Sequence, residues 1–543
     1  MHVDLTMLEW ARAQFAMTAI FHFFFVPFTL GMSFMVAFFE TIYVKTGKQE
    51  WKHITQFWQV LFGINFAIGL STGIIHEFEF GTNWSTYSWI VGDLFGAPLA
   101  VEGIVAFFME ATFAAIAFFG WKRVSKGVHL MSSWLLAAGS NLSALWILIA
   151  NGFMQHPSSA FYTFNIDNAR LEMTNFINLI LQPVAQVKFL HVVTASYTMA
   201  GVFVLGVSSL YLLRGQHKEF AKKSATVAAA FGLVASIAVA VIGDDHAYEV
   251  ANTQPTKLAA MEGLLVGEKG APIVAFGIPS HKTLEEIKNM KDGSEGFSIA
   301  IPIPHLLSIL GKHSFNGFVP GIKDLVYGNE EYGIWSFDKL KAEGQRAIKD
   351  MEEYHKAKAK MLLAEKNGNT AKIEEEKAAM KAAKKDFHAV VAEVDGVKVE
   401  RAELMGYGYL TDPAKQFFPP IAPVFFSFHI MVGLGFWFIL LFVLAYASVL
   451  KGTFTENTLV QKLALFTIPL PWLATSFGWM SAEIGRQPWT VFGILPTAHS
   501  VTPVNLVNVQ ATFFMFMAAF VILGIAELKM LFTVVKTGPK GAH

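Results

Sequence analysis

The sequence has no cysteine and few charged residues, and each shortage excludes some classes of protein. Without Cys the chain forms no disulfide, no cysteine-ligated iron–sulfur cluster and no c-type haem attachment. Any haem must therefore be held by His, Met or carboxylate side chains. Only 15% of residues are charged, whereas a soluble domain carries about 25%. The formal net charge is zero, so charge gives no sign of a nucleic-acid partner.

Apolar residues are abundant instead, at 53% of the chain, with 51 Phe. A membrane span needs about 20 mostly apolar residues. Nine runs are long enough: 15–43, 54–78, 95–121, 128–153, 184–213, 224–243, 421–450, 463–484 and 509–535. The first run is too long for a signal peptide and lacks a basic leader, so we expect a retained span. The sequence predicts an all-α integral membrane protein, a bundle of about nine transmembrane helices.

Basic residues are concentrated after the odd-numbered runs. They are Lys45, Lys48, Lys52, Lys122, Arg123, Lys126, Arg214, Lys218, Lys222, Lys223, Lys451 and Lys462. The positive-inside rule predicts that these turns are cytoplasmic. The N-terminus is then outside, and the C-terminus, with Lys536 and Lys540, is inside.

The runs divide the chain into three parts: membrane spans in 1–243, an extracytoplasmic loop at 244–418, and further spans in 419–543. Within the loop, residues 337–394 are rich in Lys, Glu and Ala and are broken by Asn-Gly-Asn at 367–369. This pattern predicts a charged helical hairpin in water. A solvated module is the favoured interpretation, and a partner-binding arm is the alternative.

Five possible iron ligands lie in the outer half of the predicted bundle. His22, Glu102 and His191 are each roughly 10 Å from the outer ends of their helices. Met431 is somewhat deeper, and Glu483 is near the outer end of its span. Buried ionisable groups are costly, so each is a functional candidate. Each also has an ordinary explanation: a paired His, a Met that fills the core, or a glutamate on a proton path. Depth alone therefore also fits a non-redox, proton-coupled transporter.

Local motifs distinguish these classes. They are Phe-His-Phe at 21–23 with Val-Pro at 26–27, Gly-Thr-Asn-Trp at 81–84, Gly-Ala-Pro-Leu-Ala-Val-Glu-Gly at 96–103, Gly-Ser-Asn-Leu-Ser-Ala-Leu-Trp-Ile-Leu at 139–148, Pro-Val-Ala-Gln-Val-Lys-Phe at 183–189, Lys-Leu-Ala-Ala-Met-Glu at 257–262 and Gly-Arg-Gln-Pro-Trp at 485–489. Over nearly its whole length the chain resembles subunit I of the cytochrome bd-type quinol oxidases. The rival haem-copper oxidases need an adjacent His-His pair, which this sequence lacks.

The resemblance implies three haems. His191 and Met431 match the axial ligands of a low-spin haem b. His22, Glu102 and Glu483 match residues around two high-spin haems: a haem b, and a haem d or a third haem b. The sequence does not decide which of the three residues faces which iron.

Other positions match in the same way. Trp479 matches an aromatic residue between haems, and Glu110 and Ser143 match polar residues on a proton route. Lys257 and Glu262 match the quinol-interacting pair of the external loop, which is known as the Q-loop. We expect this pair on a mobile loop, away from the haem ligands.

One position departs from the family. Arg usually stands two residues before the axial Met, and here His429 occupies that position. Two residues turn a helix by about 200°, so His429 and Met431 cannot both face one iron. Ligation by His429 in place of Met431 stays open as an alternative. Arg486 is also expected near haem, and the charged segment resembles the long-Q-loop form.

The resemblance implies a quinol:oxygen oxidoreductase of the bacterial cytoplasmic (inner) membrane. Quinol is oxidised at the outer face, and O2 is reduced to water with cytoplasmic protons, so charge is separated without a pump. The expected partners are subunit II, a small single-span accessory subunit, the lipid bilayer, O2 and a membrane quinol. Ubiquinol and menaquinol are not distinguished. No nucleic acid is expected.

Overall fold

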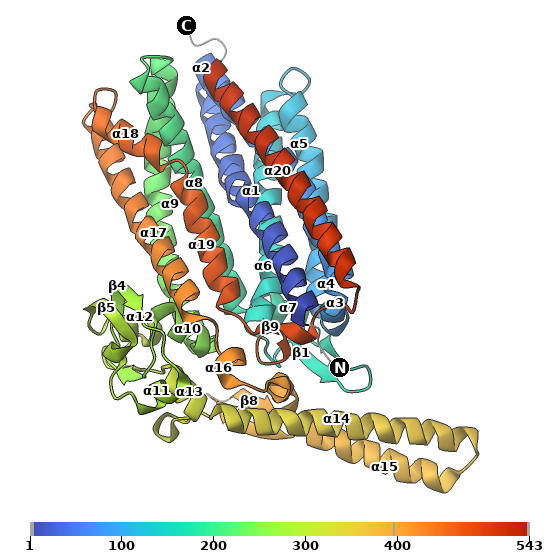
Figure 1. Ribbon diagram of the computed structural model, residues 1–543. Helices are drawn as coiled ribbons and strands as arrows, with labels where there is room; N and C mark the ends of the chain where they lie inside the picture. Colours follow the sequence, from blue (N-terminus) through green and yellow to red (C-terminus); the bar gives the residue numbers. More distant parts are fainter. Residues whose placement is uncertain (1–4, 395–396, 540–543) are drawn as a thin grey trace.

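The computed structural model describes residues 5–394 and 397–539 (Figure 1). Within them, nine helices are long and apolar enough to cross a membrane, as the sequence predicts. They are Thr6–Thr46, Gln49–Thr82, Gly92–Phe119, Lys126–Gln155, Phe176–Leu213, Lys218–Thr253, Ile421–Leu450, Thr458–Ile484 and Leu506–Thr537. Lys540, a residue of the predicted basic C-terminus, lies outside the described residues.

The bundle is built from long helices, three of whose spans are divided. The elements are α1 (Leu5–Thr46), α2 (Gln49–Thr82), α4 (Gly92–Val101), the π-helix η1 (Glu102–Phe107), α5 (Phe108–Phe119), α6 (Lys126–Gln155), α7 (Phe176–Ile180), α8 (Pro183–Leu213), α9 (Lys218–Thr253), α17 (Ile421–Leu450), α18 (Thr458–Thr467), α19 (Leu470–Ile484) and α20 (Leu506–Thr537). Small residues allow close packing. A Cβ at Gly201 of α8 would lie 2.9 Å from the Cα of Gly232 of α9.

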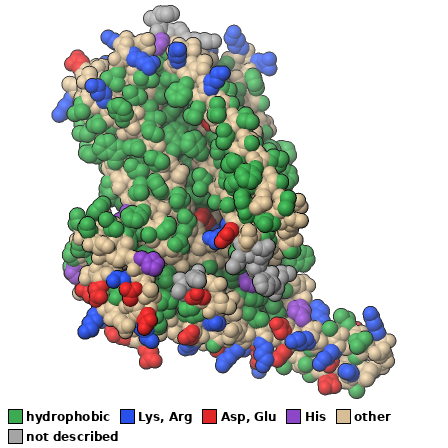
Figure 2. All heavy atoms as spheres, viewed as in Figure 1, with side chains coloured by type: hydrophobic (Ala, Val, Ile, Leu, Met, Phe, Trp, Pro, Cys, Tyr) green, Lys and Arg blue, Asp and Glu red, His purple; other side chains and the backbone are tan. Residues whose placement is uncertain are grey.

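The two ends of the bundle differ. The N-terminus and the loop between α9 and α17 lie at one end, and the C-terminus lies at the other (Figure 1). Figure 2 shows a broad hydrophobic band between the ends; Lys and Arg outnumber Asp and Glu at the end opposite the loop, whereas both charges are mixed at the loop end. We call these the loop end and the basic end.

The loop begins later than the hydropathy predicts. Helix α9 does not stop at Gly243 but continues through Asp244 and Asp245 to Thr253, and α10 (Pro255–Glu262) follows directly. The polar residues end the apolar run, but no residue before Pro255 interrupts a helix. The predicted boundary at 243 and 244 is therefore the end of the apolar run and not the end of the helix.

The charged segment forms two helices that lie side by side (Figure 1), α14 (Phe337–Lys366) and α15 (Thr370–Phe387). The chain reverses at Gly368, whose φ is +65°. The prediction of helix as far as 394 is wrong at its end. Strand β7 (Val390–Val394) pairs there with β8 (Val397–Glu400), because β-branched valines favour strands.

The remaining elements are short and lie at the loop end. They are α3 (Ser85–Ile90), β1 (Tyr162–Asn165), β2 (Arg170–Met173), β3 (Glu268–Lys269), β4 (Ile273–Pro279), α11 (Leu284–Asn289), η2 (Gly293–Gly296), β5 (Phe297–Ile303), α12 (Leu306–Lys312), β6 (Phe318–Val319), α13 (Ile322–Tyr327), η3 (Glu330–Tyr332), η4 (Arg401–Tyr409), α16 (Pro413–Gln416), β9 (Trp489–Val491), β10 (Leu495–Pro496) and η5 (Thr497–His499). The strands form separate antiparallel pairs, of which β4 with β5 is the longest.

Candidate functional site

Glu483, in the last turn of α19, is the centre of a buried polar cluster. Its Oε1 accepts hydrogen bonds from Asn151 Nδ2 and Gln155 Nε2 of α6, both at 3.1 Å. Its Oε2 forms an ion pair with Arg486. Lys188 of α8 places its Nζ 3.8 Å from Oε1. The predicted iron ligand Glu483 and the predicted haem-proximal residue Arg486 therefore contact each other, and side chains of α6 and α8 lie beside Glu483.

Lys257 connects the Q-loop to this cluster. It lies on α10 with 3% of its surface exposed, and its Nζ donates to Gln155 Oε1 and to Gln254 Oε1, the latter at 2.6 Å. Burial, and then the nearby Lys188 cation, hold the pKa of Lys257 well below its usual value. The expectation that Lys257 lies away from the predicted ligands is wrong with respect to Glu483, because Lys257 is buried beside the Glu483 cluster. One side chain, Gln155, bonds both Lys257 and Glu483.

Lys188, Asn151 and Gln155 are site residues that the sequence reasoning missed. Lys188 donates to Asn151 Oδ1, and its Nζ lies 5.6 Å from the centre of the Trp479 ring. A signal was present, because Lys188 is a charge inside an apolar run. The cluster as described contains three cationic side chains, Lys188, Lys257 and Arg486, and the single carboxylate of Glu483.

The side chain of Glu262 points to a different part of the structure from that of Lys257. Five residues separate them on α10, which is about 140° around a helix. Glu262 is 4% exposed, and its Oε2 has no hydrogen-bond partner among the described residues. Burial raises the pKa of Glu262 to about 8. This carboxyl group is thus buried inside the Q-loop and not exposed on its surface.

His191 lies between α8 and α9. A Cβ added at Gly243 of α9 would lie 3.5 Å from His191 Cε1, and the ring of His246 is 5.5 Å away between centroids. Within the described chain, the buried Nδ1 of His191 has no hydrogen-bond partner. The ring therefore has an unused polar atom, and Gly243 gives it space.

Met431 and His429 face different parts of the molecule, as their spacing predicts. A Cβ at Gly478 of α19 would lie 2.8 Å from Met431 Sδ. His429 bonds the backbone oxygen atoms of Phe425 at 2.8 Å and of Val274, in β4, at 2.7 Å. Met431 thus faces the bundle, whereas both ring nitrogens of His429 are engaged by carbonyl groups, one of them in the Q-loop.

His22 of α1 packs against α2. Its Nδ1 lies 3.0 Å from Thr72 Oγ1, and a Cβ at Gly73 would lie 2.9 Å from its Cε1. The ring of His76 is 6.1 Å away between centroids, and His76 Nε2 is a buried atom without a partner in the described residues. The sequence suggested no function for His76, and the structure places it beside a predicted ligand.

Glu102 and Glu110 both meet α6. Ser143 Oγ donates to Glu102 Oε1 at 2.5 Å, and a Cβ at Gly139 would lie 3.0 Å from Glu110 Cγ. Glu102 begins the π-helix η1, so regular α-helical turns do not separate the carboxyl groups of Glu102 and Glu110. Single π-helical turns are rare in proteins as a whole, but those that occur are frequently found at functional sites. Ser143 bonds Glu102, and Ser140 is the hydrogen-bonding neighbour of Glu110.

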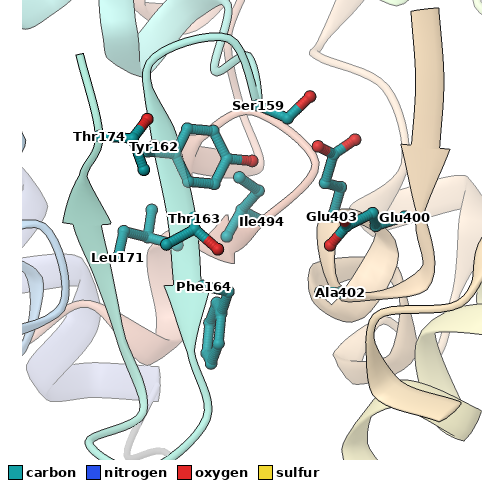
Figure 3. Close-up of a pocket in the computed structure, with 10 residues that line it drawn as sticks. All are labelled: Ser159, Tyr162, Thr163, Phe164, Leu171, Thr174, Glu400, Ala402, Glu403 and Ile494. Atoms are coloured by element: carbon teal, nitrogen blue, oxygen red, sulfur yellow. The ribbon is translucent and has the colours of Figure 1, made fainter. Parts of the chain in front are cut away.

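A cavity of about 170 Å³ lies between the β1–β2 hairpin and the residues around η4 (Figure 3). Tyr162 and Glu403 are among its lining residues, and burial raises the pKa of Glu403 to about 7. None of the predicted site residues lines this cavity, which joins the Q-loop to the segment after α6. It is separate from the Glu483 cluster.

The fold and the buried groups define an integral membrane protein that holds ionisable residues inside a helical bundle. Such residues mark paths for protons, ions or electrons.

Comparisons identify the family. A sequence model described as cytochrome bd terminal oxidase subunit I matches residues 10–539. The chain is 39% identical to cytochrome bd-II ubiquinol oxidase subunit 1 of Escherichia coli (strain K12), over 98% of this chain and 97% of that one. It is 34% identical to cytochrome bd ubiquinol oxidase subunit 1 of Bacillus subtilis (strain 168), over 91% and 86%. The bd oxidase structure from Geobacillus thermodenitrificans matches the fold with a TM-score of 0.74 and 21% identity, covering 99% of this chain and 100% of that one.

The chain belongs to the cytochrome bd terminal oxidase subunit I family. The predicted family and the predicted enzyme, a terminal oxidase of bd type, are confirmed. The protein is a multi-pass protein of the bacterial inner membrane. Membership implies haem cofactors and a partner subunit II.

The residues present fit haem. His191 has an unpartnered buried Nδ1, and Gly243, Gly73 and Gly478 provide space beside His191, His22 and Met431. The three cations around Glu483 exceed its one negative charge, and buried charges need partners. The carboxylate propionates of a haem have the sign that balances this excess.

Proposed function

We propose that this subunit takes electrons from a membrane quinol at the Q-loop end and passes them to haems that reduce O2 to water. The observation that carries the proposal is the Glu483 cluster. There, side chains from α6, α8 and α19 meet Lys257 of the Q-loop through Gln155. A quinol-contacting residue and a haem-contacting residue would thus share one hydrogen-bonding neighbour.

His191 and Met431 are the proposed holders of a low-spin haem b. His22, Glu102 and Glu483 are the proposed holders of two high-spin haems, a haem b and a haem d or third haem b. When bound, these groups carry electrons and reduce oxygen. Both ring nitrogens of His429 lie against backbone carbonyl oxygen atoms, of Phe425 and of Val274, whereas Met431 Sδ faces Gly478 of α19 inside the bundle, which supports Met431 as the ligand. Trp479, beside Lys188, would lie between haems.

At the quinol site, Glu262 would act as the general base and Lys257 would bond a quinol oxygen. The pKa of Glu262, raised to about 8 by burial, supports this assignment, because a base is most effective when its pKa is close to the working pH. Lys257 is a hydrogen-bond donor in the structure, and a lysine amine can donate to a quinol oxygen.

Protons for oxygen reduction would come from the basic end, which the positive-inside rule assigns to the cytoplasm. Glu110 lies between that end and Glu102, and Ser143 bonds Glu102. Glu110 would hold a proton and deliver it towards Glu102. Quinol protons would leave at the loop end, so turnover would separate charge without a pump. A small accessory subunit, and ubiquinol or menaquinol as the donor, complete the proposal.

A visible spectrum of the purified complex, together with oxygen consumption driven by a quinol, tests the proposal. We expect haem Soret and alpha bands, and oxygen uptake that depends on added quinol. The alpha-band positions would also report whether haem d is present. A complex with neither haem bands nor quinol-dependent uptake would instead support a proton-coupled transporter.

A further inference from the structure

A second buried polar cluster lies near the basic end of the bundle, away from the Q-loop, between α1 and α6. Glu40 of α1 is 1% exposed, and both of its oxygen atoms are bonded. Oε1 lies 2.7 Å from His129 Nδ1, and Oε2 accepts from Ser133 Oγ at 2.5 Å. Within the described chain, the buried Nε2 of His129 has no hydrogen-bond partner. A carboxylate acceptor at Nδ1 favours the proton there, so Nε2 carries a free lone pair.

Aromatic and basic side chains surround this cluster at the basic end. The ring of Trp121 lies 3.9 Å from that of His129 between centroids, and Trp121 Nε1 donates to Gln59 Oε1 at 2.8 Å. Lys52 Nζ lies 5.4 Å from the Trp121 ring, and Lys126 begins α6 one turn before His129. Trp121 and these lysines lie between the cluster and the basic end of α6. The cluster is therefore buried, but close to water.

Helix α6 connects this cluster to the proposed proton route. His129, Ser133, Ser140 and Ser143 are spaced by four, seven and three residues, so they share one face of the helix. Ser140 neighbours Glu110, and Ser143 bonds Glu102. The rise from Ser133 to Ser140 is about 10 Å. Side chains and a few waters, each bond being about 2.8 Å, can bridge that distance.

We propose that Glu40, His129 and Ser133 are the entry of the proton route to Glu110, an inference that rests on the proposed function. His129 Nε2 takes a proton from water at the basic end, and the Nδ1 proton passes to Glu40. Glu40 then releases one proton, through Ser133 and water, towards Glu110. One proton enters and one leaves, and the return of the imidazole to its first tautomer completes the cycle.

The test measures oxygen reduction in the assembled oxidase, using Glu40→Gln and His129→Gln. Each variant keeps a polar side chain of similar size but removes a proton carrier. We expect full haem content, unchanged reduction of the haems by quinol under anaerobic conditions, and oxygen consumption lowered at least about tenfold. The solvent deuterium isotope effect should rise, and Glu40→Asp should restore part of the rate.

The matched control is Thr41→Val. Trp134 Nε1 donates to Thr41 Oγ1 at 2.9 Å, so this change removes another hydrogen bond between α1 and α6 without removing a titratable group. Its oxygen consumption and isotope effect should equal those of the parent. Equal losses in Thr41→Val and Glu40→Gln would mean that the cluster only ties two helices together.

A double variant tests whether the groups act in series. Glu40→Gln with Glu110→Gln should be no slower than Glu110→Gln alone, because both residues would serve one route. If Glu40→Gln does not accumulate, Ser133→Ala removes one bond and allows the same comparison. A parental rate and pH profile in all the cluster variants overturns the inference. A parent without haem bands or quinol-dependent oxygen uptake overturns the proposed function instead.

Discussion

Two buried carboxylates, Glu483 near the loop end and Glu40 near the basic end, are held in opposite ways. Glu483 is bonded by two amides and Arg486, with Lys188 nearby. Glu40 is bonded by one imidazole and one hydroxyl group. An arginine stays charged at every relevant pH, whereas a histidine changes its charge near neutrality. The first arrangement therefore suits fixed charge, and the second suits proton exchange.

The largest difference should appear when each carboxylate is neutralised. In Glu483→Gln, three buried cations lose their only carboxylate, and breaking a buried ion pair costs about 3–5 kcal/mol. In Glu40→Gln, no arginine or lysine pair is broken, so the loss should be closer to that of one buried hydrogen bond, about 1–3 kcal/mol. We expect much less assembled, haem-loaded complex for Glu483→Gln.

Thermal unfolding and haem per protein, measured for both variants beside the parent, check this expectation. Asn151→Leu serves as a control, because it removes an uncharged partner that Glu483 and Lys188 share and leaves the ion pair of Glu483 with Arg486 in place. Equal unfolding temperatures for Glu483→Gln and Glu40→Gln would remove the distinction between fixed and exchangeable charge.

The next effect concerns one haem only. His191→Ala should abolish the low-spin haem b spectrum while the protein still inserts, because a proposed axial ligand is lost and not a helix contact. Met431→Leu should convert the same haem towards high spin. His429→Leu should keep the low-spin spectrum, because the His429 ring bonds Phe425 and Val274. Reduced-minus-oxidised spectra of the three variants show which residue the low-spin haem depends on. Loss of the low-spin bands in His429→Leu alone would contradict the choice of Met431 as the ligand.

The sequence alone predicts the membrane spans and marks Glu483 as a candidate, for physical reasons. Hydropathy predicts the nine spans, since water excludes long apolar runs whatever their neighbours are. The charge of Glu483 inside such a run marks it as functional. The end of α9 was not accessible, because hydropathy detects where apolar residues stop and not where a helix stops. The π-helix at Glu102 has no sequence signal of that kind.

The partners in each cluster were also inaccessible from one sequence. Gln155 and Lys257 are 102 positions apart, and Glu40 and His129 are 89 apart. Only tertiary packing brings such pairs together, so Lys257 was predicted on a mobile surface and His129 was not singled out. The sequence identified residue types that carry chemistry, whereas the structure shows which of them share a hydrogen bond.

A smaller effect is expected in the proton route. Glu110→Gln should keep all haems and slow oxygen reduction by about ten- to a hundredfold, since only proton delivery is impaired. Glu102→Ala should lose high-spin haem, because Glu102 is a proposed neighbour of the iron. Haem content and single-turnover oxygen kinetics separate the two. A parental rate in Glu110→Gln would exclude it from the route, and a full haem complement in Glu102→Ala would make Glu102 a proton carrier only.

The smallest expected effect is a pH dependence at the loop end, where Glu262 is a buried carboxyl group that forms no ion pair with any described residue. Its pKa is raised to about 8, so the group is mostly protonated at pH 7. A general base must be ionised, and the ionised fraction rises from roughly a tenth at pH 7 to about a half at pH 8. The rate at low quinol concentration, kcat/KM, should therefore rise about fivefold over that interval and level off above it.

Glu262→Gln should lower quinol-driven turnover and abolish this rise, while the haem spectrum is unchanged. Glu403→Gln is the matched control, because burial also raises the pKa of Glu403, to about 7, at a site that none of the predicted site residues lines. Its pH profile should match that of the parent. A rise that persists in Glu262→Gln would assign the titration to another group. A rate that falls between pH 7 and 8 in the parent would contradict the base role, because ionisation of a base can only increase the active fraction.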